Sequence, residues 1–349
     1  MRVGIVLGAG GVVGASWLIG ALEALESETG WSAADADYIV GTSAGSVIGT
    51  LVASGIPSAY ISAYASGRSL DGMEPPPGLE VDVAELERRE SGDAYRLALA
   101  LPPIGPGSWR MALSTMRNPL RHPAGAVLCG WLPRGFVSTA PIARIVDRFV
   151  TGDWPDHPNL WIVGCDYVSG RRAVFGSGDA PPAKIRDAVA ASCAIPAFYH
   201  PVRIAGRRYV DGGVCSLSNA DLLCDRDLDV VIVLNPMSAA AGAGGGGPVQ
   251  RVAGAVRGLA GRRLGHEVGK LREQGTEVLV LQPTADDLDV MGANMMARGR
   301  RIEVMEQSLR STARVLRQRR IDLPKLPRSR RGKAAARSGS APAAVRKAA

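Results

Sequence analysis

The chain has 349 residues, of which 46% are hydrophobic, so it is long enough to bury a sizeable core within one α/β domain. Its formal net charge is +8 at pH 7, but eight Lys or Arg residues and no acid lie from Lys325 onward, so the rest of the chain is balanced. A basic character confined to one end argues against a specific nucleic-acid-binding domain and leaves only nonspecific contact through that end.

The spacing of the cysteines and histidines argues against a Cys-x-x-Cys site and against a metal site. The five cysteines include no Cys-x-x-Cys pair and lie in apolar contexts, so we expect reduced core residues of a cytoplasmic protein. Histidines occur without His-x-x-x-His spacing, and neither a metal nor a cofactor is expected. Only Met1 and Arg2 precede the first strand, and no apolar run reaches the roughly 18 residues of a membrane span, so we expect neither a signal peptide nor a span.

The first predicted strand, residues 3–7, ends in a glycine-rich stretch over residues 8–14, and a helix over residues 16–25 follows. Backbone N–H groups that converge at a helix N-terminus hold an anion. In an acyl-transfer enzyme this anion is the oxygen of the tetrahedral intermediate, so this stretch is a candidate for an oxyanion hole. A dinucleotide loop is the alternative, although the glycine spacing differs and the acids at the expected distance precede a strand instead of ending one.

Residues 38–49 predict an apolar strand that turns through Gly-x-Ser-x-Gly into a helix of small residues. This pattern is typical of a nucleophile elbow. A serine hydroxyl is a weak nucleophile that must stand clear of its own backbone, and Gly41 and Gly45 provide that clearance around Ser43. The alternative is a glycine-rich turn with an incidental serine, because short motifs also match by chance.

The next part of the chain predicts a helix over residues 54–64, a loop over 66–79 and a helix over 86–101. Residues 102–135 are expected to be the least regular part. Apolar residues are interleaved there with arginines, and no acid occurs. Such an insert suits a cap over an acyl-chain groove or a face lying on anionic lipid. The alternative is a helix pair packed on the body with its arginines in water.

Further along, residues 160–168 and 171–175 predict a strand hairpin, and residues 184–192 a helix. Asp166 at the end of the first strand is expected to be a structural hydrogen-bond acceptor, with a second catalytic acid as the alternative. Asp211 ends another short strand and enters the turn Gly212-Gly213. Its carboxylate could take the serine proton without a histidine, although Asp-Gly-Gly by itself is more often a hairpin turn.

The C-terminal part predicts a buried strand over residues 229–235, a mobile Ala/Gly stretch over 238–247, a long basic helix over 249–274 and a strand over 277–282. The last helix, residues 300–319, has an apolar face of Ile302, Met305, Leu309, Ala313 and Leu316. Alternating strands and helices predict an α/β fold with a mostly parallel central sheet and helices on both faces. We expect one domain over residues 1–322 and a basic disordered tail over 323–349.

Three motifs together resemble those of the patatin-like phospholipases, over roughly residues 1–235: Gly10-Gly11-x-x-Gly14, Gly41-x-Ser43-x-Gly45 and Asp211-Gly212-Gly213. The run 191–198 before the basic hairpin is also similar to that family. The resemblance implies a three-layer sandwich with a Ser43 nucleophile, an Asp211 base and an oxyanion hole at Gly10 and Gly11. This chain departs from the family pattern in its first loop, where Ala9 and Val13 stand in place of a glycine and an arginine.

We therefore expect a serine-dependent acyl ester hydrolase with a Ser-Asp dyad, acting through an acyl-enzyme on lipid or other acyl esters. One alternative is a triad of Ser43, Asp211 and His266, which fits poorly because that α/β-hydrolase fold places several strands before its elbow. Another is a lipid-binding protein that keeps the fold but little chemistry. The insert and the tail suggest peripheral contact with the anionic inner face of the membrane, whereas the oligomeric state is not predicted.

Overall fold

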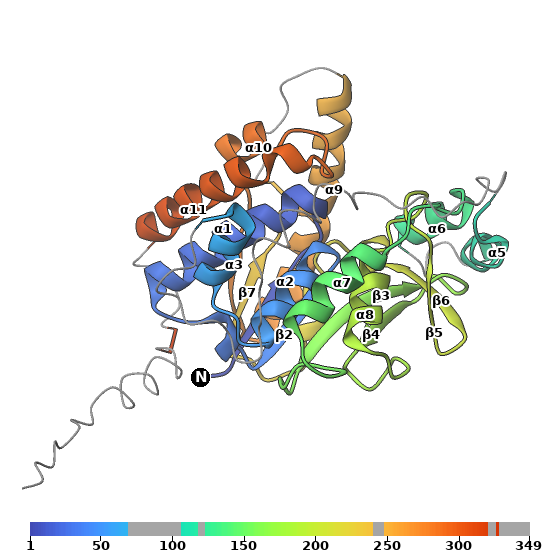
Figure 1. The fold of residues 1–349 in the computed structure, drawn as a ribbon, viewed down its shortest axis with the longest axis horizontal. Helices are drawn as coiled ribbons and strands as arrows, with labels where there is room; N and C mark the ends of the chain where they lie inside the picture. Colours follow the sequence, from blue (N-terminus) through green and yellow to red (C-terminus); the bar gives the residue numbers. More distant parts are fainter. Residues whose placement is uncertain (69–105, 118–122, 240–247, 320–325, 328–349) are drawn as a thin grey trace, which may run out of the picture.

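The computed structural model describes residues 1–68, 106–117, 123–239, 248–319 and 326–327 (Figure 1). The predicted helix over 86–101, most of the predicted loop over 66–79, most of the Ala/Gly stretch and nearly all of the basic tail lie outside these residues. Within the described part, no helix is both long enough and apolar enough to cross a membrane.

Eight strands form one sheet in the order β5-β6-β3-β2-β1-β7-β8, and β4 pairs with β3 beside this path. The pairs from β3 through β2, β1 and β7 to β8 are parallel, whereas β4 and β6 run antiparallel to β3, and β5 runs antiparallel to β6. The strands are β1 (Val3–Leu7), β2 (Tyr38–Thr42), β3 (Leu160–Asp166), β4 (Arg172–Phe175), β5 (Val202–Ile204), β6 (Arg207–Asp211), β7 (Val230–Leu234) and β8 (Glu277–Leu281).

Helices cover both faces of this sheet. Because successive side chains of a strand point to opposite faces, Ile5 and Leu7 pack into one core cluster while Val6 packs into a second. The second cluster contains Leu264, Val268 and other residues of α9, and the first contains residues of α1, α2, α3, α7, α8 and α11. The described α-helices are α1 (Gly11–Thr29), α2 (Ala44–Ala53), α3 (Ser58–Ser66), α5 (Trp109–Arg117), α6 (Ala124–Trp131), α7 (Ala140–Phe149), α8 (Ile185–Ser192), α9 (Pro248–Glu273), α10 (Ala285–Met291) and α11 (Arg301–Gln318).

The predicted fold class is confirmed, because the sheet is mostly parallel and lies between two layers of helices. The extent of helix differs from the prediction most clearly in α1 and in the insert. Helix α1 begins at Gly11 instead of residue 16, because the glycines themselves form its first turn: the Gly14 N–H donates to the Gly10 carbonyl at 2.9 Å. Residues 109–117 and 124–131 are helical, although the insert was expected to be irregular.

The buried face of α11 also differs from the predicted apolar face. Ile302 is 48% exposed, and buried hydroxyl residues such as Ser308 and Thr312 take part in the contact instead. The reason is the close approach of α1, where a side chain at Gly20 would overlap the Met305 carbonyl oxygen. The Ser308 Oγ donates to the Trp17 carbonyl at 2.7 Å across this contact. Short polar side chains therefore fit where larger apolar ones would hold the helices apart.

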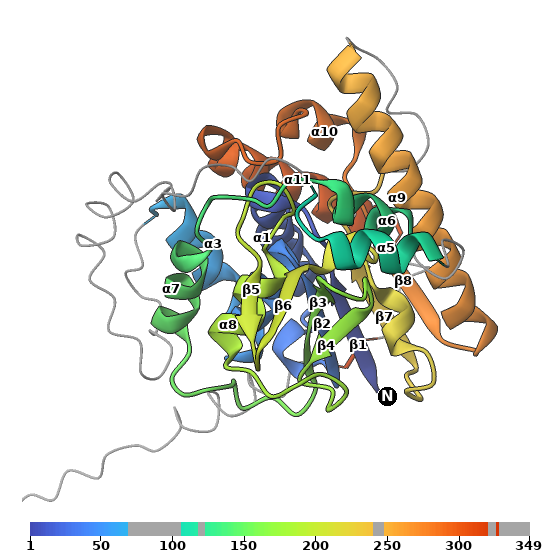
Figure 2. The same cartoon turned by 90° about the vertical axis from the view of Figure 1, so that its right-hand side faces the viewer.

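Helices α5 and α6 pack against each other and lie beside β6 at the antiparallel end of the sheet (Figures 1 and 2). Their inner faces bury Met111, Ala126 and Cys129 in a cluster with Cys165 and other residues of β3, β6 and the following turn. In the part of the insert that the structure describes, a helix pair therefore packs on the body.

Candidate active site

The glycine-rich loop and the serine turn lie next to each other at one edge of the sheet. Strands β1 and β2 are parallel neighbours with Leu7 opposite Gly41, so both end at the same edge. A β-carbon at Gly45 would overlap the Leu7 carbonyl oxygen, and one at Gly41 would lie 2.6 Å from the Gly45 carbonyl oxygen. The two glycines of the elbow therefore allow β1, β2 and α2 to meet without side chains between them.

Ser43 occupies the tight turn between β2 and α2, with φ 52° and ψ −121°. A positive φ is a strained conformation for a residue with a β-carbon. The turn is held by Ser192 of α8, whose hydroxyl accepts the Ser43 N–H at 2.9 Å and donates to the Val163 carbonyl at 2.6 Å. Sequence analysis did not identify this role of Ser192, although the residue lies in the run 191–198 that resembles the family.

The topology of β3 brings Asp211 to Ser43. Strand β4 pairs with β3 from Ile162 to Cys165 and so occupies one side of it. Strand β2 pairs with Ile162 and Val163, and strand β6 pairs with Gly164 and Cys165, so both must lie on the other side of β3. Along that side Thr42 lies opposite Val163 and Asp211 opposite Gly164. Because β2 is parallel and β6 antiparallel to β3, the two strands run toward each other and end at neighbouring positions.

The Asp211 carboxyl group is buried and contacts the serine. It accepts the Gly213 N–H at 2.7 Å and hydrogen-bonds to the Ser43 side chain. Burial raises the pKa of Asp211 to about 6, and these two hydrogen bonds oppose the increase. Such a carboxylate is ionised at neutral pH and is a stronger base than an exposed aspartate.

Cys193 is a second buried nucleophile candidate beside Ser43, but its thiol is not activated. Burial, followed by the charge of Asp211, raises the pKa of Cys193 to about 12, although hydrogen bonds with Ser46 and Ser43 oppose this. The reactive form of cysteine is the thiolate. A neutral Cys193 therefore packs against the serine and does not replace it.

The backbone N–H groups of the first loop divide into two sets. Ala9 donates its N–H to the Leu217 carbonyl at 2.8 Å, and Val13 donates to the Met295 carbonyl at 3.0 Å. In the part of the chain that the structure describes, the N–H groups of Gly10, Gly11 and Val12 donate to no protein acceptor. The side chain of Val13 is fully buried in the core, so this position contributes no charge to the loop.

Other acids and histidines considered in the sequence lie in different settings. Asp166 accepts the N–H groups of Val168 and Ser169 at 2.9 and 2.8 Å, in keeping with a structural acceptor at a strand end. His266 is exposed on α9. Among the described residues, no group of three or more His, Cys, Asp or Glu could hold a metal ion.

A buried polar network supports the loop that follows Asp211. Glu267 of α9 accepts hydrogen bonds from the hydroxyls of Ser216 and Ser218, each at 2.6 Å, and from the Ala220 N–H at 2.9 Å. In the same loop the Asn219 amide donates to the hydroxyl of Thr42, directly before Ser43, at 3.0 Å. Sequence analysis did not predict this network, because Glu267 and Arg263 have the i, i+4 spacing of an exposed helix pair.

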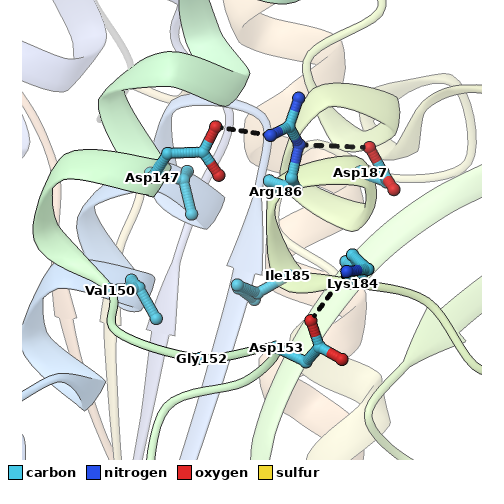
Figure 3. A pocket seen from close by; sticks show the side chains of 9 residues that line it. Asp147, Val150, Gly152, Asp153, Lys184, Ile185, Arg186 and Asp187 are labelled. Atoms are coloured by element: carbon cyan, nitrogen blue, oxygen red, sulfur yellow. Dashed lines mark hydrogen bonds and ion pairs between the residues drawn. The ribbon is translucent and has the colours of Figure 1, made fainter.

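A pocket of about 570 Å³ between α7 and α8 is lined by none of the predicted site residues (Figure 3). Its cations face acids: Arg186 pairs with Asp147 at 2.6 Å, and Lys184 pairs with Asp153 at 3.1 Å. Because these charges neutralise each other, this pocket does not suggest an anion site.

The strain at Ser43 predicts that Ser43→Gly is more stable than Ser43→Ala by about 1 kcal/mol. Strain of this kind costs about 1–3 kcal/mol, and glycine removes it at an entropic cost of about 0.5–1 kcal/mol. Both variants lack the hydroxyl, so alanine is the matched control and urea denaturation is the measurement. Equal stability of the two variants would contradict a strained turn.

The fold and this turn define an α/β protein with a serine at the strand-to-helix elbow beside a buried aspartate. The profile of the patatin-like phospholipase family matches residues 5–223, and the chain belongs to that family. The chain is also similar to VipD from Legionella pneumophila, with 12% identity, a TM-score of 0.42 and coverage of 91% of this chain and 67% of VipD. For the type III effector protein ExoU the identity is 17%, the TM-score 0.35 and the coverage 91% of this chain and 53% of ExoU.

Proposed function

We propose that this protein is a serine-dependent acyl ester hydrolase acting on lipids, with Ser43 as the nucleophile and Asp211 as the base. The observation that carries the proposal is the approach of the Ser43 side chain to the buried Asp211 carboxylate, at the point where two strands from distant parts of the chain meet. Membership of the patatin-like phospholipase family supports lipid as the substrate class.

In the proposed reaction, Asp211 accepts the hydroxyl proton while the Ser43 Oγ attacks the ester carbonyl carbon. The oxygen of the tetrahedral intermediate is stabilised by the N–H groups of Gly10 and Gly11. Asp211 then returns the proton to the departing alcohol, which leaves the acyl group on Ser43. In the second half, Asp211 takes a proton from water, the hydroxide attacks the acyl carbon, and the proton returns to Ser43 as the fatty acid leaves.

The test is turnover of p-nitrophenyl butyrate and palmitate by the purified full chain, together with labelling by a serine-reactive phosphonate. We expect hydrolysis of both esters and a single phosphonate adduct at Ser43 in the peptide mass spectrum. The phosphonate reports on an activated serine even where the ester is a poor substrate. A chain that neither hydrolyses the esters nor reacts with the phosphonate would be a lipid-binding protein that keeps the fold.

The elevated pKa of Asp211 predicts the pH dependence of the reaction. Because the base must be ionised, kcat/KM is expected to rise about tenfold per pH unit below about pH 6 and to level off above it. The profile is measured with p-nitrophenyl butyrate, and melting temperatures over the same range control for unfolding. A kcat/KM that stays level down to pH 4 would exclude a base with this pKa.

A further inference from the structure

The outer face of the α5–α6 pair is unusually apolar for a surface. Five of its side chains form what we call the apolar face: Trp109, Leu113, Met116, Leu128 and Trp131. Their exposed fractions range from 43% to 60%, and the two tryptophan rings contact each other edge to face with 5.9 Å between centroids. The spacing along α5 is i, i+4 and i+7, so three of these residues form one continuous stripe.

This apolar face is not needed to hold the two helices on the body. The opposite faces of the same helices supply Met111, Ala126 and Cys129 to the buried cluster. Large apolar side chains that remain exposed together on a folded surface mark an interaction site. Arg110 and Arg117 are exposed on the same short helix, so the apolar stripe has cations beside it.

A pocket of about 520 Å³ lies directly beside the apolar face and shares Trp109 with it. Five arginines line it, and we call it the arginine pocket: Arg110, Arg134, Arg203, Arg207 and Arg208. Arg207 pairs with Asp166 at 3.0 Å, but among the described residues Arg110, Arg203 and Arg208 pair with no carboxylate. The Nε atom of Arg134 is buried and has no hydrogen-bond partner in that part of the chain. In contrast to the pocket between α7 and α8, this one has more cations than paired carboxylates within the described part of the chain.

Both features lie close to the candidate active site. Gly125 of α6 packs against the Val214 backbone, in the turn that follows Asp211. Strand β6 begins at Arg207 in the arginine pocket and ends at Asp211, four residue steps away, which corresponds to about 13 Å. A ligand bound in the arginine pocket would therefore lie roughly 13 Å from Asp211 along β6.

We propose that the apolar face and the arginine pocket together dock this protein on a bilayer that contains anionic phospholipid. The apolar side chains enter the interface between headgroups and acyl chains, where tryptophan is favoured, and the arginines bind lipid phosphate groups. A bilayer with anionic phospholipid matches both features, because it offers an apolar interior and a dense layer of phosphate groups. The proposal rests on the proposed function only in so far as the docked lipid is also the substrate.

The test uses the full chain carrying Ser43→Ala, so that no lipid is hydrolysed, in co-sedimentation with vesicles of phosphatidylcholine with or without phosphatidylglycerol. Leu128→Ala/Trp131→Ala is expected to weaken binding to the mixed vesicles about 30-fold, because two partly buried apolar side chains are lost from the interface. Arg203→Gln/Arg208→Gln is expected to weaken binding about 20-fold on the mixed vesicles and to leave binding to pure phosphatidylcholine unchanged.

Matched controls come from exposed residues elsewhere. Leu259→Ala/Ile302→Ala removes equally exposed apolar side chains, and Arg251→Gln/Arg262→Gln removes two cations from α9. Both controls are expected to bind within about threefold of the parent chain, and melting temperatures verify that every variant is folded. Equal losses in variants and controls, or full binding by Leu128→Ala/Trp131→Ala, would overturn the proposal. Because the parent cannot hydrolyse esters, this result is independent of whether the wild-type chain is a hydrolase.

Discussion

Asp211→Asn is expected to lower kcat/KM for p-nitrophenyl butyrate by about 1,000- to 10,000-fold while the fold is retained. An amide cannot take the proton from the Ser43 hydroxyl, so the nucleophile loses its base. In the wild-type chain the Gly213 N–H donates a hydrogen bond to the Asp211 carboxylate at 2.7 Å, and the asparagine oxygen can still accept this hydrogen bond. The loss should therefore appear in the rate and not in the melting temperature.

Three further variants separate a dyad from a triad. Ser43→Ala is expected to lose at least as much activity as Asp211→Asn, because the two residues act as a unit. His266→Ala removes the triad candidate, and His200→Ala removes the imidazole that follows Tyr199. Both are matched controls, and each is expected to keep most of the activity. Activity of Asp211→Asn above a tenth of wild type, or a loss of several orders of magnitude in a histidine variant, would assign the base to another residue.

Gly45→Ala is expected to destabilise the protein by about 3 kcal/mol or more, measured by urea denaturation. Helix propensity alone predicts that Gly45→Ala increases the stability of the protein, because Gly45 lies in the first turn of α2 and alanine is the better helix former. The added β-carbon would overlap the Leu7 carbonyl oxygen, and this backbone is fixed by pairing of β1 with β2 and β7. The neighbouring strands therefore cannot move aside without breaking their register.

Gly265→Ala provides the control for this substitution, because no atom lies within 4 Å of the position of its added β-carbon. In α9 the same change should stabilise the protein by about 0.5–1 kcal/mol through helix propensity alone. If Gly45→Ala had the stability of the wild type, α2 would not approach β1 as closely as described.

Several features could be predicted because they depend on neighbours in the sequence. The apolar runs of β1 and β7 and the glycines of the elbow specify strands and a tight turn through local patterns, and the structure contains these elements. The face of α11 could not be predicted in this way, since its partner is Gly20 of α1, far away in the chain. A periodic pattern identifies a face but not the helix that packs on it.

The same distinction applies to the candidate active site. Ser192, which holds the Ser43 turn, and Glu267, which supports the loop after Asp211, are an ordinary helical serine and glutamate in the sequence. Their roles depend on burial and on partners from other elements. The raised pKa of Asp211 likewise follows from desolvation, which a linear pattern does not contain.

The sequence by itself determined the strand-turn-helix unit around Ser43 and the short strand that ends at Asp211, because each depends on contiguous residues. It also determined the family, because the motifs occur in the order typical of that family. Only the tertiary structure decided that β2 and β6 run toward each other along one side of β3, so that the serine and the aspartate meet. It also decided which face of α5 and α6 remains exposed. The physical reason is that strand pairing and burial depend on which distant segments pack together, and a local pattern does not specify that choice.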